Sequence, residues 1–502
     1  MGSLLVAGTT SDAGKTVVVA GLCRALARQG VSVAPFKAQN MSLNSYVTRD
    51  GAEIGRAQAA QAHAARVEPE ALMNPVLLKP GSDTSSQLIV LGRAVGERDA
   101  TSYWGDHQAS LLDVVVDAHR DLASRFDVVV CEGAGSPAEI NLRGSDIVNL
   151  GFARAADVPV VIVGDIDRGG VFASFVGTLA VLDAADQALV AGFVVNKFRG
   201  DVSLLEPGLD LLAGISGRPT LGVLPFVEGI GLDAEDAIDR ALLLSGAPAL
   251  GEDVLRINVV AFPRMSNHTD IDALALEPGV VVRFVREAAQ LGDADLVVLP
   301  GTRATVADLT WMRERGLDAA VARHAAAGRP VLGICGGYQM LGTVIDDDVE
   351  SRSGRVEGLG LLPVRTRFGA DKVLARPSAL VDDGSGGSAV VEGYEIHHGV
   401  VERDGGEPAV GSEGCRVGDT TGTVWHGLME NDVVRRRYLA DVAAACGRRF
   451  VVSTSVSFAD ERESRLDRLG DLVADHLDLA AVEQLVERGA PILPTLRLNL
   501  DR

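Results

Sequence analysis

Near-continuous runs of apolar residues alternate with helical stretches between Met1 and about Val227. Strands that are covered on both faces lose the apolar–polar alternation of half-exposed strands, so runs of this kind are typical of parallel sheets. The pattern predicts a doubly wound α/β domain over residues 1–230. Five of its strands are expected at residues 4–7, 32–36, 127–131, 158–163 and 191–195.

The rhythm is lost over residues 231–252, which become acidic and are predicted to form a linker. New apolar runs at 254–260, 296–300 and 330–334 predict a second doubly wound α/β domain over residues 253–446. A stretch rich in Gly, Ser and Asp at 382–388 is expected to be a solvated loop. Residues 447–502 are expected to be a helical extension, with a charged surface helix over 458–488 packed on the second domain.

The 502 residues have a globular composition, with 47% hydrophobic and 23% charged residues. The five cysteines show no metal-ligand spacing, which argues against a zinc cluster or a disulfide framework and favours a reducing cytoplasm. We expect no membrane partner, because neither a signal-peptide pattern nor a run of about 18 apolar residues occurs. A formal net charge of −21 also disfavours nucleic acid as a partner. The oligomeric state is not predicted.

A glycine-bounded loop from Gly8 to Thr16 follows the first predicted strand and opens a helix. Its backbone N–H groups and the helix N-terminus would hold the phosphates of ATP, with Lys15 on the β and γ oxygens and Thr16 on Mg²⁺. Five residues separate Gly8 from Gly14, one more than in the strict phosphate-loop pattern. Strand, loop and helix nevertheless follow in the required order, so we predict an ATP site.

Lys37 and Glu132 stand at the ends of two further predicted strands. Open α/β sheets place functional groups outside the carboxyl ends of their strands. Glu132 suits a metal carboxylate, and ordinary surface or capping roles are the alternative for both residues.

Cys335 lies between an apolar strand and a helical stretch, with Gly333 and Gly337 two positions to either side. Strand-to-helix turns of the form G-x-nucleophile-x-G expose the central side chain in strained backbone geometry. The positive end of the following helix would lower the pKa of the thiol. Cys335 is therefore a candidate nucleophile, and a buried cysteine in a glycine-rich turn is the alternative.

A cysteine nucleophile needs an oxyanion hole and a base. The backbone N–H of Gly336 and the loop at Gly301 are candidates for the hole. Three histidines follow predicted strands, and spacing alone does not choose among them as the base: His397, His398 and His426.

The acidic residue that often stands two positions after a catalytic histidine is missing after His426, because position 428 is Leu428. This absence predicts a Cys–His dyad rather than a triad. Glu430 is a weak candidate for orienting the histidine.

A phosphate loop in one domain and a cysteine elbow in another suggest ATP-driven amide formation. Phosphorylation would give a carboxylate a leaving group, and Cys335 could release ammonia from glutamine through a thioester. The competing class is a partitioning-type ATPase acting as a binding switch, which has no use for a cysteine elbow.

Long motifs over nearly the whole chain resemble the cobyric acid synthase family of cobalamin biosynthesis. The offset phosphate loop is similar to that of dethiobiotin synthetase relatives, and the second domain resembles class I glutamine amidotransferases. The motifs that carry the resemblance are residues 8–16, 35–45, 73–80, 132–142, 165–172, 196–201, 335–339 and 425–427.

The resemblance implies that Cys335 and His426 are the glutaminase nucleophile and histidine, without an acidic partner. It further implies sites for ATP, glutamine and the corrinoid. The ATP-binding set is Gly14, Lys15, Thr16, Lys37 and Asn196, with Thr16 and Glu132 on the metal. The oxyanion and glutamine set is Gly301, Gly336 and Gln339. The corrinoid and acyl-phosphate set is Asn141, Arg143 and Asp146, with helix capping as the alternative for Asp146.

The activity that the resemblance implies is amidation of the b, d, e and g carboxylates of adenosylcobyrinic acid a,c-diamide. Each amidation would consume ATP, with Mg²⁺, and L-glutamine. Competing activities within the enzyme class are the a,c-diamide synthase of the same pathway and a cell-wall amidotransferase. The motifs around Asn141 and at residues 165–170 favour cobyric acid synthase.

Overall fold

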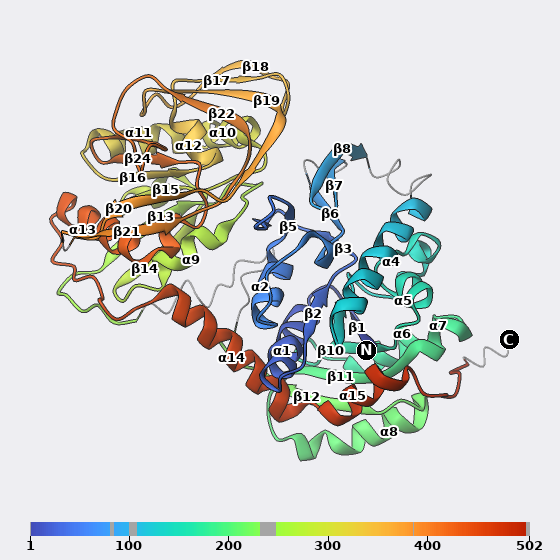
Figure 1. The fold of residues 1–502 in the computed structure, drawn as a ribbon. Helices are drawn as coiled ribbons and strands as arrows, with labels where there is room; N and C mark the ends of the chain where they lie inside the picture. The colour runs from blue at the N-terminus through green and yellow to red at the C-terminus, as the bar shows by residue number, and fades with distance from the viewer. Residues whose placement is uncertain (1, 81–84, 100–107, 231–246, 385, 498–502) are drawn as a thin grey trace. The chain divides into compact units, whose positions relative to one another are not determined.

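The computed structural model describes residues 2–80, 85–99, 108–230, 247–384 and 386–497. By its internal contacts the chain divides into two compact units (Figure 1). Unit 1 comprises Met1–Ser42, Thr48–Glu235 and Glu463–Arg502, and unit 2 comprises Leu43–Val47 and Asp236–Arg462. The predicted linker at 231–252 lies mostly outside the described residues, since 231–246 are not among them.

The central sheet of unit 1 has six parallel strands in the order β12-β11-β10-β1-β9-β2. They are β1 (Gly2–Gly8), β2 (Val33–Phe36), β9 (Val128–Glu132), β10 (Val160–Asp165), β11 (Val190–Phe198) and β12 (Thr220–Pro225). The five predicted strands are confirmed. The sixth, β12, lies at the sheet edge and is partly exposed, so it lacks the continuous apolar run that predicts the others.

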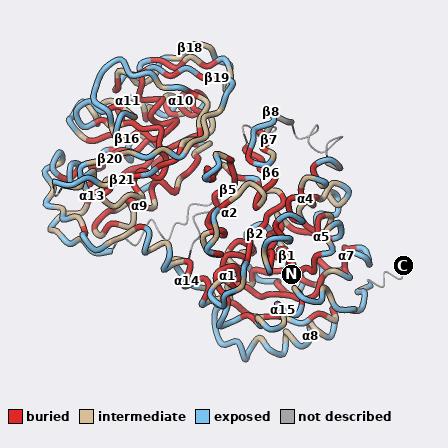
Figure 2. The backbone as a smooth tube through the Cα atoms, viewed as in Figure 1, coloured by how far each residue is buried: buried red, intermediate tan, exposed pale blue. Residues whose placement is uncertain are grey.

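Alternate side chains of these strands enter two hydrophobic cores, one on each face of the sheet. In β1, Leu5 and Ala7 belong to one core, and Leu4 and Val6 belong to the other. Figure 2 shows the strands as a buried layer. Apart from the C-terminal segment, the helices described in unit 1 are α1 (Lys15–Arg28), α2 (Arg56–Ala64), α4 (Gln108–Arg125), α5 (Leu150–Ala156), α6 (Val171–Ala180), α7 (Ala184–Leu189) and α8 (Glu206–Ser216).

A smaller sheet of unit 1, in the order β3-β6-β7-β8, is not predicted by the apolar pattern. Its strands are short or mostly polar: β3 (Gln39–Met41), β6 (Val76–Pro80), β7 (Ser85–Val90) and β8 (Arg93–Asp99). Lys79 of β6 forms a buried ion pair with Glu53 of β5 (Glu53–Gly55), with 2.9 Å between Nζ and Oε1.

The main sheet of unit 2 has the order β14-β13-β15-β16-β24-β23, and only the β23–β24 pair is antiparallel. Its strands are β13 (Leu255–Val260), β14 (Val280–Val285), β15 (Leu296–Leu299), β16 (Val331–Ile334), β23 (Cys415–Val417) and β24 (Thr420–Thr423). The three predicted strands are confirmed. The helices of this unit are α9 (Asp272–Ala275), α10 (Thr305–Glu314), α11 (Leu317–Ala326), α12 (Gly336–Leu341) and α13 (Asp432–Ala445).

A second sheet of unit 2 has the order β18-β17-β19-β22. It consists of β17 (Val344–Asp347), β18 (Gly354–Glu357), β19 (Val364–Ala375) and β22 (Glu395–Arg403). Between β19 and β22 in the sequence, β20 (Ser378–Asp382) and β21 (Ser388–Glu392) form a hairpin. The solvated loop predicted at 382–388 is the turn of this hairpin, of which residue 385 lies outside the described part.

The C-terminal segment is helical, as predicted, but its predicted position is wrong. From Glu463 onward, α14 (Phe458–His476) and α15 (Leu479–Arg488) belong to unit 1, not to the second domain. The apolar side chains of both helices share a core with α1, and the buried Arg24 of α1 pairs with Glu463 and Asp467 at 2.6 and 2.8 Å. Periodicity shows that a helix has an apolar face, but not which surface will cover it.

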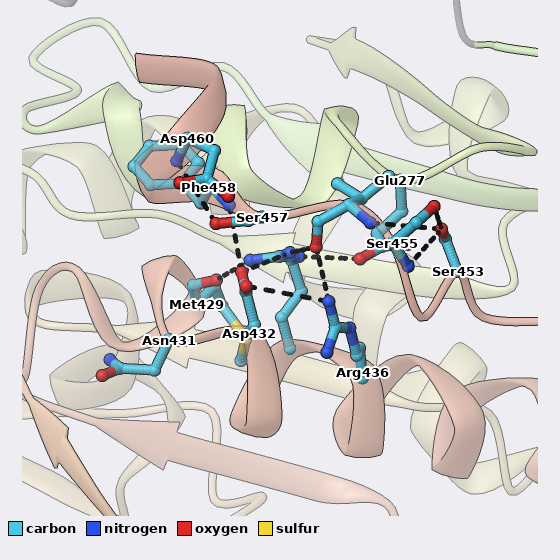
Figure 3. A network of polar contacts seen from close by, with 12 residues as sticks. Glu277, Met429, Asn431, Asp432, Arg436, Ser453, Ser455, Ser457, Phe458 and Asp460 are labelled. Carbon is cyan, nitrogen blue, oxygen red and sulfur yellow. Dashed lines mark hydrogen bonds and ion pairs between the residues drawn. The ribbon is translucent and has the colours of Figure 1, made fainter. Parts of the chain in front are cut away.

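A network of polar contacts connects several segments of unit 2, among them those with Glu277, Met429 and Asp432 (Figure 3). The fully buried Arg435 of α13 takes part in it. Its guanidinium donates to Glu277 at 3.0 Å, to the carbonyl of Met429 at 3.1 Å and to Asp432 at 2.7 Å. A buried cation is tolerated only when its hydrogen-bonding capacity is satisfied in this way. The network therefore holds the turn at Met429.

Within the described residues, no helix is both long and apolar enough to cross a membrane.

Candidate active sites

The loop between β1 and α1 has the geometry of a phosphate cradle. Gly14 has a φ of +94°, and a Cβ there would collide with the side-chain amide of Asn196, so only glycine fits. The Lys15 ammonium donates to the carbonyls of Thr10, Ser11 and Gly135 at 2.9, 3.0 and 3.1 Å. The lysine side chain thus folds back onto the loop at the N-terminus of α1, where anions are stabilised.

Glu132, at the end of β9, is the centre of a buried cluster beside this loop. Its carboxylate accepts hydrogen bonds from Thr16 at 2.9 Å, Lys37 at 2.6 Å and Gln61 at 2.5 Å. Burial alone would raise the pKa of Glu132, but the charge and hydrogen bond of Lys37 and the hydrogen bond of Gln61 lower it. The structure therefore brings together Lys15, Thr16, Lys37 and Glu132, with the carboxylate ionised.

Asn196, at the carboxyl end of β11, also belongs to the loop's surroundings. Its side-chain amide donates to the carbonyl of Ala13 at 2.9 Å, and its oxygen accepts from the backbone of Lys197. Lys197 has a φ of +60° and donates to Asp165 at 2.9 Å. Asn196 thus supports the residue that precedes Gly14.

The residues predicted for the corrinoid region are spread along one loop and have different surroundings. Asn141 is exposed. Arg143 makes a bidentate pair with Asp186, at 2.5 and 2.7 Å. Asp146 accepts from the backbone N–H groups of residues 148, 149 and 151 at the start of α5. For Asp146 the structure therefore has the capping geometry that was the alternative.

Cys335 occupies a sharp turn between β16 and α12. Its φ of +50° and ψ of −109° lie outside the regions that non-glycine residues favour, and such strain is stored mainly at functional sites. A Cβ at Gly337 would collide with the carbonyl of Leu299, and one at Gly333 would come within 2.8 Å of the backbone of Tyr338. The flanking glycines are therefore required by close packing of the turn.

His426 is the histidine that faces Cys335, and it has an acidic partner. Its Nδ1 lies 2.6 Å from Oδ2 of Asp270, whose Oδ1 accepts from the backbone N–H of Gly427 at 2.7 Å. Nδ1 therefore carries a proton, and the other ring nitrogen faces the thiol. The predicted dyad is wrong in its geometry, because the structure gives His426 an acidic partner, and Cys335, His426 and Asp270 have the arrangement of a triad. Glu430, the weak candidate, instead pairs with Arg462 at 3.5 Å.

The triad favours an ion pair between thiolate and imidazolium. Burial raises the pKa of the Cys335 thiol, but the charge and hydrogen bond of His426 outweigh burial and lower it. Burial lowers the pKa of His426, whereas Asp270 and Cys335 raise it, to about 10. The positive charge of His397 also lowers the pKa of the thiol. A buried thiolate is the reactive form of cysteine.

His397 and His398 are predicted to follow a strand, but they lie within β22. Nδ1 of His397 lies 2.7 Å from the carbonyl of Gly399, and Nε2 lies 3.3 Å from Glu395. Both ring nitrogens thus face acceptors. Glu395 also accepts from the indole N–H of Trp425, which precedes His426, at 2.9 Å. His397 is engaged with these partners beside Cys335, and of the three candidate histidines His426 has the acidic partner.

The predicted oxyanion and glutamine residues lie around the triad. A Cβ at Gly301 would be 2.9 Å from Cε1 of His426, and one at Gly336 would be 2.7 Å from Thr302. These glycines leave room where the two loops meet. Gln339 is buried and bridges two elements, accepting from Thr305 at 3.3 Å and donating to the carbonyl of Gly399 at 3.5 Å. Its amide therefore ties α12 to neighbouring segments.

Asp270 is the functional residue that the sequence interpretation missed. It lies 156 positions before His426, so no local spacing connects them. One signal could have found it. Asp270 follows β13, a correctly predicted strand, and the loops after parallel strands converge at one sheet edge.

Two protein-family models match most of the chain. Residues 4–237 match a family model described as a CobQ/CobB/MinD/ParA nucleotide binding domain. Residues 256–434 match one described as a CobB/CobQ-like glutamine amidotransferase domain. A solved structure of a glutamine amidotransferase is 21% identical, covering 38% of this chain and 98% of its own, with a TM-score of 0.31.

Curated relatives match over nearly the full length. The cobyric acid synthase of Streptomyces avermitilis is 63% identical over 98% of this chain and 97% of its own. The cobyric acid synthases of Streptomyces coelicolor and Frankia casuarinae are 63% and 57% identical, each over 98% of this chain and over 97% and 98% of their own. With both halves matched by family models and relatives this similar, the chain belongs to the cobyric acid synthase family.

Proposed function

We propose that this glutamine-dependent amidoligase amidates the b, d, e and g carboxylates of adenosylcobyrinic acid a,c-diamide to give adenosylcobyric acid. Residues 1–230 would bind ATP and the corrinoid, and residues 253–446 would hydrolyse glutamine. The observation that carries the proposal is the pairing, in one chain, of a phosphate cradle at Lys15 with a cysteine triad at Cys335. Neither site alone accounts for ATP-driven amide formation.

At the triad, the Cys335 thiolate would attack the side-chain amide carbon of glutamine. A carbon–sulfur bond forms, the carbon–nitrogen bond breaks, and His426 gives its proton to the departing nitrogen, which leaves as ammonia. Asp270 holds the ring and stabilises its charged form. Water then hydrolyses the γ-glutamyl thioester to glutamate, with His426 as the base.

At the phosphate cradle, a substrate carboxylate would take the γ-phosphoryl group of ATP, so that the bond to the bridging oxygen breaks and ADP leaves. Ammonia would then attack the resulting acyl phosphate and convert it to an amide, with loss of phosphate. Lys15 and the amide groups at the start of α1 would stabilise the charge on the transferred group. Lys37 is held near them by its bond to Glu132. Arg143 and Asn141 are proposed to face the corrinoid.

Thr16 and Glu132 fit a magnesium ion. Their oxygen atoms are buried, 2.9 Å apart, and of the hard type that Mg²⁺ prefers, and the carboxylate is ionised. When bound, Mg²⁺ would neutralise negative charge on the phosphates. The described cysteines are all free thiols, which suits a nucleophile working in the reducing cytoplasm that we propose.

The experiment that tests the function is mass spectrometry of the corrinoid after incubation with the enzyme, ATP, Mg²⁺ and glutamine. We expect successive losses of about one mass unit per amidation, because each OH is replaced by NH₂, which is lighter by that amount. Omitting ATP is the control. An unchanged a,c-diamide in the presence of all components would overturn the substrate assignment.

The change Asp270→Asn tests the triad. Without a carboxylate at Nδ1, the pKa of His426 falls and its ion pair with the Cys335 thiolate weakens. We expect glutamine hydrolysis to fall on the order of 10²-fold or more. The rate of Cys335 alkylation by iodoacetamide should reach its half-maximum at a higher pH than in the wild type.

The matched control for this change is Asp295→Asn. Asp295 is another buried acid of unit 2, but its carboxylate accepts from Arg448 at 2.8 Å and from the backbone N–H of Arg256 at 2.9 Å rather than from His426. An unchanged alkylation profile in Asp270→Asn would show that the acid does not orient His426.

A further inference from the structure

The short segment Leu43–Val47 is encoded inside the nucleotide-binding half of the sequence but belongs to unit 2. Its residues Asn44, Ser45 and Val47 are 1%, 0% and 0% exposed. The chain enters it directly from β3 and leaves it toward β5, and both of those strands are part of unit 1. None of the chemistry described above uses this segment.

One end of the segment clamps the loop that carries Asp270. The side-chain oxygen of Asn44 accepts from the backbone N–H of Asn267 at 2.8 Å, and the side-chain oxygen of Asn267 accepts from the backbone N–H of Ser45 at 2.9 Å. Asn267 has a φ of +51°, in the left-handed region that asparagine adopts more readily than most residues, and the two bonds to the segment fix it there. Its carbonyl in turn accepts from the backbone N–H of Asp270 at 3.1 Å.

The other end supports the ring of His426. Tyr46 packs on Tyr394, with ring centroids 5.9 Å apart, and Tyr394 stacks on His426 at 5.3 Å with an interplanar angle of 25°. Tyr394 and His426 also exchange two backbone hydrogen bonds, of 3.0 and 2.9 Å. Val47 shares a small buried apolar cluster with Tyr394 and Ile396.

We propose that Leu43–Val47 is a positioning element of the glutaminase site. Asn44 acts through Asn267 on Asp270, and Tyr46 acts through Tyr394 on His426. Asp270 and His426, which together favour the thiolate form of Cys335, are thus both held by one segment of the chain. Because this piece is continuous with β3, which begins two residues after Lys37, the ATP-binding half of the sequence supplies part of the framework of the glutaminase site.

This inference rests on the proposed glutaminase role of Cys335. It makes Asn44 and Tyr46 positioning residues rather than catalytic ones. Their loss should change the rate of the step at the thiol and leave the binding of glutamine and the use of free ammonia unaffected.

The test is Asn44→Ala in the full-length enzyme. We expect kcat for glutamine hydrolysis to fall about 10-fold to 100-fold, the size of effect that a small misplacement of reacting groups produces. KM for glutamine should stay within about two-fold, and amidation with ammonium chloride should stay at the wild-type rate. The pH midpoint of Cys335 alkylation should rise, which a general loss of stability would not cause.

Three further variants make the test specific. Asn44→Asp keeps an oxygen acceptor for the N–H of Asn267 and should restore most of the rate. Tyr46→Leu keeps an apolar side chain without the ring and should also lower kcat. It serves as the test if Asn44→Ala fails to fold. Asn258→Ala is the matched control, because Asn258 is an equally buried asparagine of unit 2 that bonds to Gln290, not to the triad loop.

Two results would overturn the proposal. One is a wild-type kcat and alkylation profile in both Asn44→Ala and Tyr46→Leu. The other is an equal loss with glutamine and with ammonium, because the segment would then serve the whole fold. Failure of the proposed function itself would be seen separately, as glutamine hydrolysis that survives Cys335→Ala.

Discussion

Replacing Cys335 with alanine is expected to abolish glutamine-dependent amidation while leaving amidation with ammonium salts intact. In the proposed mechanism, the sulfur of Cys335 is the triad atom that bonds to glutamine. Losing a nucleophile of this kind lowers the reaction rate on the order of 10⁴-fold or more. The phosphate cradle at Lys15 is unaffected by the change, so ammonia added directly should still attack the acyl phosphate. Corrinoid products formed with each nitrogen source are measured by mass spectrometry.

Cys415→Ala is the matched control for this prediction. Cys415 is also a buried cysteine of unit 2, and its thiol lies 3.5 Å from the carbonyl of Gly405 rather than near His426. It should keep both activities. Equal loss of glutamine- and ammonium-dependent amidation in Cys335→Ala would contradict the scheme of two separate sites.

Replacing Lys15 with alanine is expected to remove amidation with both nitrogen sources. The Lys15 ammonium curls over the loop at the start of α1, where the transferred phosphoryl group would develop its charge. Removing one such electrostatic donor costs at least about 10²-fold in rate. Amidation is measured with glutamine and with ammonium chloride, and ATP binding is measured by calorimetry.

The triad provides an internal check on Lys15→Ala. Thioester formation at Cys335 needs no phosphate, so the variant should still be alkylated with the wild-type pH profile. Arg28→Ala removes a cation from the other end of α1, where it forms exposed pairs with Asp471 at 2.6 Å and Asp467 at 4.0 Å, and should have little effect. Wild-type amidation by Lys15→Ala would remove the cradle from the mechanism.

Five strands of the first main sheet, three of the second and the turn at Cys335 follow from short-range features of the chain, whereas β12 and β14 do not. A continuous apolar run identifies a strand covered on both faces without knowledge of what covers it. Glycines two positions on either side of Cys335 identify a tight turn for the same reason, since the collisions that exclude a Cβ at Gly333 and Gly337 involve the turn's own strand and helix or an adjacent strand. The strand runs and the collision at Gly333 depend on residues nearby in the sequence, whereas the collision at Gly337 comes from Leu299 of β15.

The choice among histidines had no such local cause. His397, His398 and His426 all stand near strands of similar composition, and only folding brings His426 to the thiol. The acidic partner shows the limit most clearly: the pattern after His426 predicts none, yet Asp270 reaches it from 156 positions away. Long-range pairing of this kind depends on strand order, which periodicity does not encode.

The phosphate loop and the site at Cys335 differ in the same way, because the first depends mainly on local contacts and the second on long-range ones. Phosphate binding is carried by one loop and one helix start, so its residues could be located from the order strand, loop and helix. The C-terminal helices and the Leu43–Val47 segment lie in units other than those suggested by their sequence neighbours. Local patterns establish many of the buried strands and which thiol lies in a strained turn. The folded chain decides what covers the C-terminal helices and what orients His426, because those contacts join residues from 156 to 443 positions apart.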